Sequence, residues 1–166
     1  MPKAGYLTAT EYKAIRKLLG FTLEEAKDFH KVQNISTIKR WENGYSKISE
    51  LACDKITDLL KKINWTIAQA LEKVDEMPED SEVVLITYPE SCIRKFAVGF
   101  QNLPANVHNA MIARLYSAIR EKGIACGVVE FNVQDYLNFL AINKMQDNQA
   151  SRSAWAGDYR SRLIIQ

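Results

Sequence analysis

Two segments near the amino terminus carry the pattern that begins an α-helix. Each has a threonine followed three residues later by a glutamate, at Thr8 and Glu11 and again at Thr22 and Glu25. In this capping box the hydroxyl accepts from the glutamate amide, and the carboxylate accepts from the threonine amide. Gly20 lies between them and can adopt the left-handed conformation that ends a helix. The pattern therefore predicts two short helices joined by a tight turn.

Apolar side chains recur at helical spacing after each of these starts. The short segment 32–35 allows only a sharp turn, so a third helix is expected at about residues 36–43. Gly44 then ends the third helix, and Ser46 or Ser49 can cap a fourth. The amino-terminal part is predicted to be a compact helical bundle.

The fourth helix is predicted to continue beyond the bundle, because its apolar stripe extends to Val74. The following segment, 76–82, is acidic and interrupted by Pro78, which indicates a boundary. We therefore expect a helical domain with an extended last helix over residues 1–75, an acidic linker over 76–82, and a second module over 83–166.

Two apolar runs of strand length, residues 83–88 and 124–131, predict buried strands in the second module. Between them, Pro104 can begin a helix that Gly123 ends, and Asn132 can cap a further helix. The predicted fold class is mainly α with a small α/β part: an amino-terminal helical bundle of the lambda-repressor-like kind and a small carboxy-terminal αβ module.

A sheet of two strands leaves strand edges unpaired, which is unfavourable in an isolated module. Pairing between two copies would cover these edges, so a homodimer is expected, with the module of residues 83–166 as its dimerisation part. The final stretch, residues 155–165, either packs back onto this module or stays mobile.

Charge is distributed unevenly along the chain. The net charge is only +2, but residues 1–62 contain twelve lysines and arginines against eight acidic residues, and the remainder contains ten against twelve. The amino-terminal part is therefore the candidate for contact with phosphates.

The sequence argues against a membrane, disulfide or metal protein. No apolar run reaches the roughly eighteen residues of a membrane helix, and no apolar signal segment follows residues 1–5, so a cytoplasmic location is expected. Three widely separated cysteines indicate reduced thiols. His30 and His108 show no ligand spacing, so we expect neither a metal nor a cofactor.

The segments 14–22 (AIRKLLGFT) and 37–44 (TIKRWENG) resemble the Cro and phage-repressor (Xre-like) helix-turn-helix family. The resemblance covers about a third of the chain and implies a dimeric repressor of transcription that binds double-stranded DNA and is not an enzyme. Two positions depart from the family pattern. Leu23 replaces a glutamine that braces a phosphate, and Lys31 stands where a turn glycine is common, in a turn one residue longer than usual.

A looser resemblance, in helix spacing and in an additional carboxy-terminal region, is to small bacterial and phage autoregulators associated with anti-CRISPR operons.

The Cro-type resemblance also implies roles for single residues, with the third helix in the major groove. Arginine and lysine can donate to guanine, serine can contact either base edge, and an aliphatic side chain can contact the thymine methyl. Arg16 and Glu42 are expected to form a structural ion pair, with Ile38 and Trp41 in the core. The candidate base contacts are Asn34, Ile35, Ser36, Lys39 and Arg40, and the candidate phosphate contacts are Asn43, Tyr45 and Lys47.

Two other functions remain open at this stage. An enzyme would have to use Cys92 or His108, but no phosphate-binding glycine loop, nucleophile elbow or pair of catalytic carboxylates accompanies them. A helix-turn-helix adaptor or antitoxin would bind RNA or a protein partner, and the modest net charge is compatible with that alternative.

Overall fold

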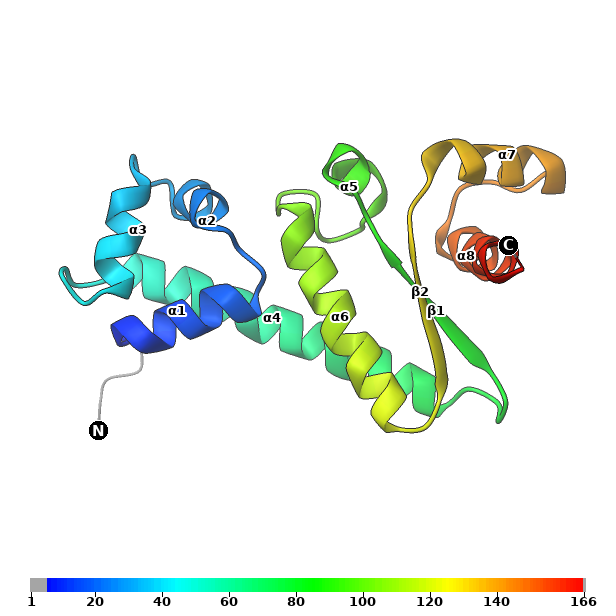
Figure 1. Ribbon diagram of the computed structural model, residues 1–166, viewed down its shortest axis with the longest axis horizontal. Helices are drawn as coiled ribbons and strands as arrows, with labels where there is room; N and C mark the ends of the chain where they lie inside the picture. The colour runs from blue at the N-terminus through cyan, green and yellow to red at the C-terminus, as the bar shows by residue number, and fades with distance from the viewer. Residues whose placement is uncertain (1–5, 166) are drawn as a thin grey trace. The chain divides into compact units, whose positions relative to one another are not determined.

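The computed structural model describes residues 6–165, and residues 1–5, inspected above for a signal segment, lie outside this range. The described chain is mainly helical with one small parallel sheet, so the predicted fold class is confirmed (Figure 1). The helices are α1 (Ala9–Leu18), α2 (Leu23–His30), α3 (Ile35–Glu42), α4 (Glu50–Asp75), α5 (Glu90–Phe96), α6 (Ala105–Glu121), α7 (Val133–Asn143) and α8 (Gln149–Ile164), and the strands are β1 (Glu82–Thr87) and β2 (Ala125–Glu130).

The chain forms two compact units, Met1–Ala68 and Gln69–Gln166, and the division between them falls within α4. The first unit contains α1, α2, α3 and the amino-terminal part of α4. The acidic segment 76–82 belongs to the second unit, where it leads from α4 to the first strand. Within residues 6–165, no helix is long and apolar enough to cross a membrane.

Both predicted capping boxes are present in the first unit. The Thr8 hydroxyl accepts from the Glu11 amide at 3.2 Å, and the Glu11 carboxylate accepts from the Thr8 amide at 2.7 Å. The corresponding distances for Thr22 and Glu25 are 3.1 and 2.8 Å. At the start of α4 the Ser49 hydroxyl accepts from the Ala52 amide at 3.2 Å, which decides between the two serines considered for this cap.

The third helix begins one residue earlier than predicted. It covers Ile35–Glu42, not 36–43, because Asn34 has the extended backbone of a cap residue, with φ −133° and ψ 142°. The preceding helix ends at His30, and Lys31 takes the left-handed conformation with φ 57°. Lys31 thus takes a conformation that a glycine would adopt without strain.

Three aromatic rings, one from each of the first three helices, form the centre of the first unit. The rings of Tyr12, His30 and Trp41 are in mutual contact, with centroid separations of 5.6 to 5.7 Å. Tyr12 and Trp41 are buried, as is Ile38 on α3. The predicted core positions of α3 are therefore confirmed, and the opposite side of that helix must face outward.

The sheet of the second unit is parallel, with Glu82 opposite Ala125 and Thr87 opposite Glu130. Helices α6 and α8 pack against both strands, and Figure 1 shows them on opposite faces of the sheet. Both strands lie within one residue of their predicted bounds. The prediction that both strands are buried is wrong, because most side chains of β1 are only half-buried and three of the six residues of β2 are exposed.

The sequence analysis missed α5, which follows β1 directly after Pro89. Its Glu90 carboxylate accepts from the Ala105 amide at 2.7 Å and so caps α6 across fifteen residues of chain. The final stretch of the chain lies in α8, which packs back onto the second unit. Trp155 is fully buried against Phe131 and Tyr136, at centroid separations of 5.1 and 5.8 Å.

Candidate nucleic-acid interface

The outer face of α3 is built from positions three and four residues apart. Ser36, Lys39, Arg40 and Asn43 are all exposed, and they alternate with the buried Ile38 and Trp41. Side chains with this spacing lie on one side of a helix. The helix therefore turns a polar, basic side to the solvent and an apolar side to the core.

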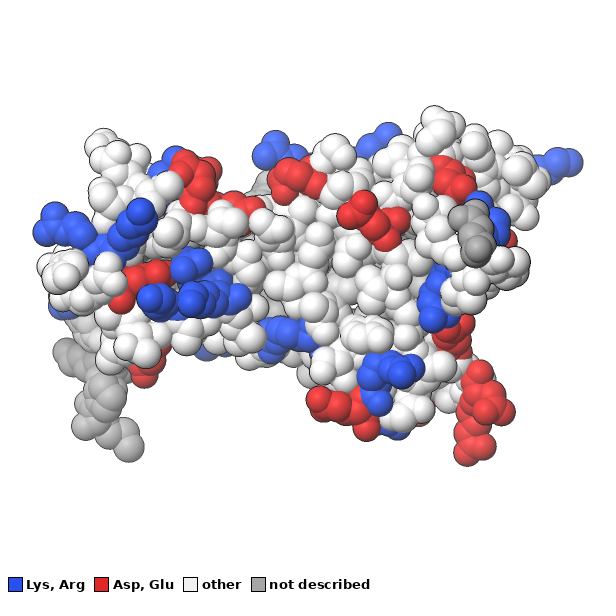
Figure 2. All heavy atoms as spheres, viewed as in Figure 1, with Lys and Arg blue, Asp and Glu red and all other residues white. Residues whose placement is uncertain are grey.

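Lys39 and Arg40 are the strongest donors on this face. Neither has a carboxylate partner in the part of the chain that the structure describes, whereas Lys27 nearby is paired with Glu24 and Asp28. Figure 2 shows lysine and arginine side chains gathered over α1 and α3 in the first unit. Exposed cations without internal partners are available for an anionic ligand such as a phosphate or the guanine edge.

The two predicted base contacts at the start of α3 differ in how exposed they are. Asn34 is exposed, and its side chain makes no capping bond to α3 within the described residues, so its amide is available to a ligand. Ile35 is half-buried and contributes partly to the packing of the unit. Of this pair, Asn34 is therefore the more accessible.

The loop after α3 carries the predicted phosphate contacts Tyr45 and Lys47. Gly44 turns the chain with φ 72°, and Tyr45, whose amide donates to the Arg40 carbonyl at 2.9 Å, is 78% exposed. The Lys47 ammonium lies 4.3 Å from the centre of the Tyr6 ring. Tyr6 was not selected from the sequence, because no local pattern connects it with a lysine forty-one residues further along.

A buried ion pair holds α3 to α1. Arg16 donates from Nε to Glu42 Oε1 and from Nη2 to Glu42 Oε2, the second at 3.2 Å, and it also donates to the Phe21 carbonyl. The two charged side chains are only 9% and 7% exposed. Both charges are thus used inside the unit and are unavailable for a ligand, while the pair fixes the direction in which α3 points.

His30 occupies an apolar site between the helices. In the part of the chain that the structure describes, neither of its ring nitrogens has a hydrogen-bond partner, and the nearby Tyr12 hydroxyl also lacks one. Burial, assisted by the positive charge of Lys55, lowers the pKa of His30 to about 4. Burial, together with the charge of Glu42, also raises the pKa of Tyr12. Both rings are therefore neutral packing groups at pH 7.

Cys92 and His108, the residues considered for catalysis, are both buried in the second unit. Burial raises the pKa of the Cys92 thiol and lowers the pKa of His108. A buried thiol with a raised pKa is the opposite of an activated nucleophile. His108 packs edge-on against Tyr88 and Phe100, at centroid separations of 5.2 and 5.0 Å.

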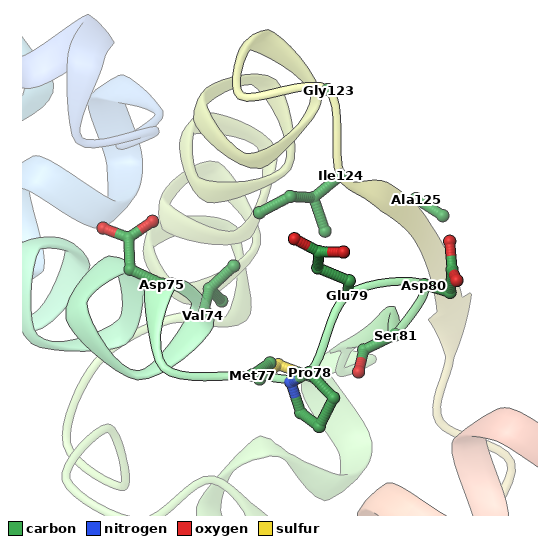
Figure 3. A pocket seen from close by; sticks show the side chains of 10 residues that line it. All are labelled: Val74, Asp75, Met77, Pro78, Glu79, Asp80, Ser81, Gly123, Ile124 and Ala125. Carbon is green, nitrogen blue, oxygen red and sulfur yellow. The ribbon is translucent and has the colours of Figure 1, made fainter.

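A hollow of about 600 Å³ lies between the last turn of α4 and the start of β2 (Figure 3). Its lining includes Val74, Met77 and Ile124 together with several carboxylates. One of these, Asp75, accepts hydrogen bonds from the Lys122 ammonium at 2.7 and 2.8 Å. No group of three or more histidine, cysteine or acidic residues suited to a metal ion occurs within residues 6–165. The basic face of α3 is therefore a stronger candidate for a functional site than this hollow.

A basic face on one helix of a helical bundle is the kind of feature through which a protein can bind an anionic polymer such as nucleic acid. The chain belongs to the Aca2/YdiL-like family, whose model matches residues 7–123. This is a family of anti-CRISPR-associated transcriptional regulators, so a role in the regulation of transcription follows.

The match supports the looser of the two resemblances, to anti-CRISPR-associated regulators, and not the assignment to the Cro type. A comparison with curated proteins gave no match. The matched range includes α1 to α6 and β1, whereas β2, α7 and α8 lie beyond it.

Proposed function

We propose that the protein is a sequence-specific DNA-binding regulator of transcription, a dimeric repressor that places α3 in the major groove. The observation that carries the proposal is the exposed face of α3, where Lys39 and Arg40 have no carboxylate partner among residues 6–165. The buried pair of Arg16 and Glu42 supports it, because the pair ties α3 to α1 with the exposed face of α3 outward.

The chemistry assigns two kinds of contact. Lys39 and Arg40 donate to guanine N7 and O6, with Ser36 and Asn34 available to neighbouring base edges and Ile35 to a thymine methyl. The residues after them contact phosphates and thereby set the register on the duplex without reporting sequence. The phosphate contacts are Asn43, Tyr45 and Lys47.

A homodimer is part of the same proposal. Regulators of this size recognise paired half-sites about one DNA turn apart, which requires two copies of the recognition helix. Within the described residues the sheet has only β1 and β2, so each strand keeps one edge without a strand partner. We propose no catalytic role for Cys92 or His108, since both are buried packing groups.

The test is selection of bound fragments from the source genome, followed by binding to the selected site. Replacing Lys39 or Arg40 by alanine should weaken specific binding by about 1 to 3 kcal/mol for a residue that makes a base contact. Arg94→Ala is the matched control, because it removes one exposed positive charge from α5 in the second unit. This control should bind the site normally.

The salt dependence of binding provides the second criterion. DNA binding through phosphate contacts predicts an affinity that falls steeply with salt, and a specific site predicts resistance to competitor DNA. If the Lys39→Ala, Arg40→Ala double variant binds the selected site as tightly as the wild type, α3 is not the recognition helix. Binding to RNA or to a protein partner, with no selected DNA fragment, would instead favour the adaptor alternative.

A further inference from the structure

The start of α1 lies beside the loop that follows α3. This loop, residues 43–49, joins α3 to α4. A methyl group added to Gly44 would lie 3.9 Å from the Ala9 methyl group at the start of α1, and the Lys47 ammonium lies 4.3 Å from the centre of the Tyr6 ring. Two independent contacts therefore join the segment before and at the start of α1 to the loop that carries the proposed phosphate contacts.

Both partners of the Tyr6–Lys47 contact are attached to anchored backbone. Tyr6 precedes Thr8 by two residues, and the capping box of Thr8 with Glu11 fixes the chain at that point. Lys47 directly precedes Ile48, which is only 4% exposed and anchors the loop in the core of the first unit. The contact thus joins two segments that the fold holds in place.

The contact between Tyr6 and Lys47 differs from an ion pair. The face of an aromatic ring attracts an ammonium group, but the ring has no net charge that would cancel the charge of the lysine. Lys47 has no carboxylate partner among residues 6–165, in contrast to Lys27, which is paired with Glu24 and Asp28. Lys47 therefore keeps its positive charge for a phosphate while the ring restrains its side chain.

This restraint favours binding of a ligand. A lysine side chain has a long, flexible stem, and ordering it at an interface costs conformational entropy. A side chain that is already held in place before binding loses less of this entropy. The Tyr6 ring is 45% exposed and Lys47 is also exposed, so the contact forms at the surface, where a phosphate can reach the ammonium.

We propose that Tyr6 is a positioning residue of the nucleic-acid interface, whose ring holds the Lys47 ammonium in place for a phosphate of the DNA backbone. This inference rests on the proposed function for the identity of the ligand, and it adds to the interface a residue from outside α3 and its loop. Tyr6 lies one residue before the range 7–123 that matches the family model.

The experiment is a double-mutant cycle on binding of the selected DNA fragment by the full chain. Lys47→Ala should reduce the slope of log affinity against log salt by about 0.9, the value for one lost phosphate contact. Tyr6→Leu should weaken binding about two- to fivefold, the range of an exposed contact between a cation and a ring, and should have no further effect when residue 47 is already alanine. Tyr6→Phe keeps the ring and should bind like the wild type.

Tyr116→Leu is the matched control, because Tyr116 lies on α6 in the second unit and is 37% exposed, close to the value for Tyr6. This control should leave the affinity unchanged, and far-ultraviolet circular dichroism checks that every variant is folded. The inference is overturned if Tyr6→Leu weakens binding equally with and without Lys47, or if Tyr6→Phe loses as much affinity as Tyr6→Leu.

A measurement without DNA separates this inference from the proposed function. In the nuclear magnetic resonance spectrum of the free chain, the ring current of Tyr6 should shift the ε-methylene protons of Lys47 upfield. Tyr6→Leu should abolish this shift and Tyr6→Phe should keep it. Absence of the shift in the wild type would overturn the inference even if Lys39 and Arg40 bind the DNA site. If the shift is present but no DNA fragment is selected, the proposed function fails, and the phosphate role of Tyr6 fails with it.

Discussion

The two units of the protein are stabilised by contacts of different range. In the first unit the caps join residues three apart, and the main ion pair, Arg16 with Glu42, joins residues 26 apart. In the second unit Arg160 bonds to Glu82 across 78 residues, and Arg152 bonds to the Phe96 carbonyl across 56. The stabilising contacts of the first unit therefore join residues that are closer along the chain. The second unit depends on contacts that its carboxy-terminal helix α8 makes with distant segments.

The units also use their charges differently. Among residues 6–165, the first unit buries the pair of Arg16 and Glu42 and leaves Lys39 and Arg40 without a carboxylate partner, while the three arginines of α8 in the second unit are all paired with carboxylates. Free cations on a rigid helix suit binding of an anionic polymer, and a neutralised surface with exposed aliphatic residues suits association between proteins. This contrast separates the ligand-binding role proposed for one unit from the assembly role proposed for the other.

The largest expected effect on stability comes from breaking a buried ion pair. Glu42→Gln removes the carboxylate that compensates the buried Arg16, and it should lower the free energy of unfolding of the first unit by about 3 kcal/mol. Asp158→Asn in the second unit should lower the free energy of unfolding by about 0.5 kcal/mol or less. The ion pair of Asp158 with Arg162 is exposed, and Arg162 would still be paired with Asp135. Urea denaturation followed by tryptophan fluorescence measures both. Equal losses for the two variants would contradict the contrast.

An intermediate effect is expected from acid. The pKa of His30 is about 4 in the folded chain against about 6.5 when unfolded, so between these values the unfolded chain binds more protons. Stability should therefore fall as the pH falls from 6.5 to 4, by about 1 to 2 kcal/mol after allowance for partial solvent screening.

The variant His30→Gln isolates this contribution, because glutamine does not titrate. Urea midpoints measured from pH 4 to pH 7 should depend less on pH for the variant than for the wild type. Parallel profiles would show that the His30 ring accepts a proton in the folded unit without cost.

The smallest expected effect tests a feature that the units share. Lys31 directly follows helix α2 and Lys144 directly follows helix α7, and both have the left-handed conformation, with φ 57° and 53°. Replacing either lysine by glycine relieves steric strain but adds freedom to the unfolded chain, so a net gain of about 0.5 to 1 kcal/mol is expected. Thermal denaturation measures the gain. A lower melting temperature for Lys31→Gly would mean that the lysine side chain itself stabilises the turn.

The structures of the two units were predictable to different degrees. The caps of α1 and α2 follow from four residues of local sequence each, and the outward face of α3 follows from helical spacing. The start of α3 differs by one residue because Asn34 has the extended backbone of a cap residue, which the residue types around it do not specify. The helix α5 was missed, because Pro89 and Glu90 form only a weak start signal and the role of Glu90 as a cap for α6 appears only in three dimensions.

Sequence alone determined the elements whose causes are local: the capped helices, the apolar stripes, the basic character of the first unit and the positions of the two strands. Tertiary structure decided which of those elements meet. It paired β1 with β2 in parallel, buried Trp155 against the sheet side of the unit, brought Tyr6 to Lys47 and opened a groove between α7 and α8. The physical reason is that a cap or a stripe depends on neighbours along the chain, whereas burial and pairing depend on which distant surfaces exclude water together.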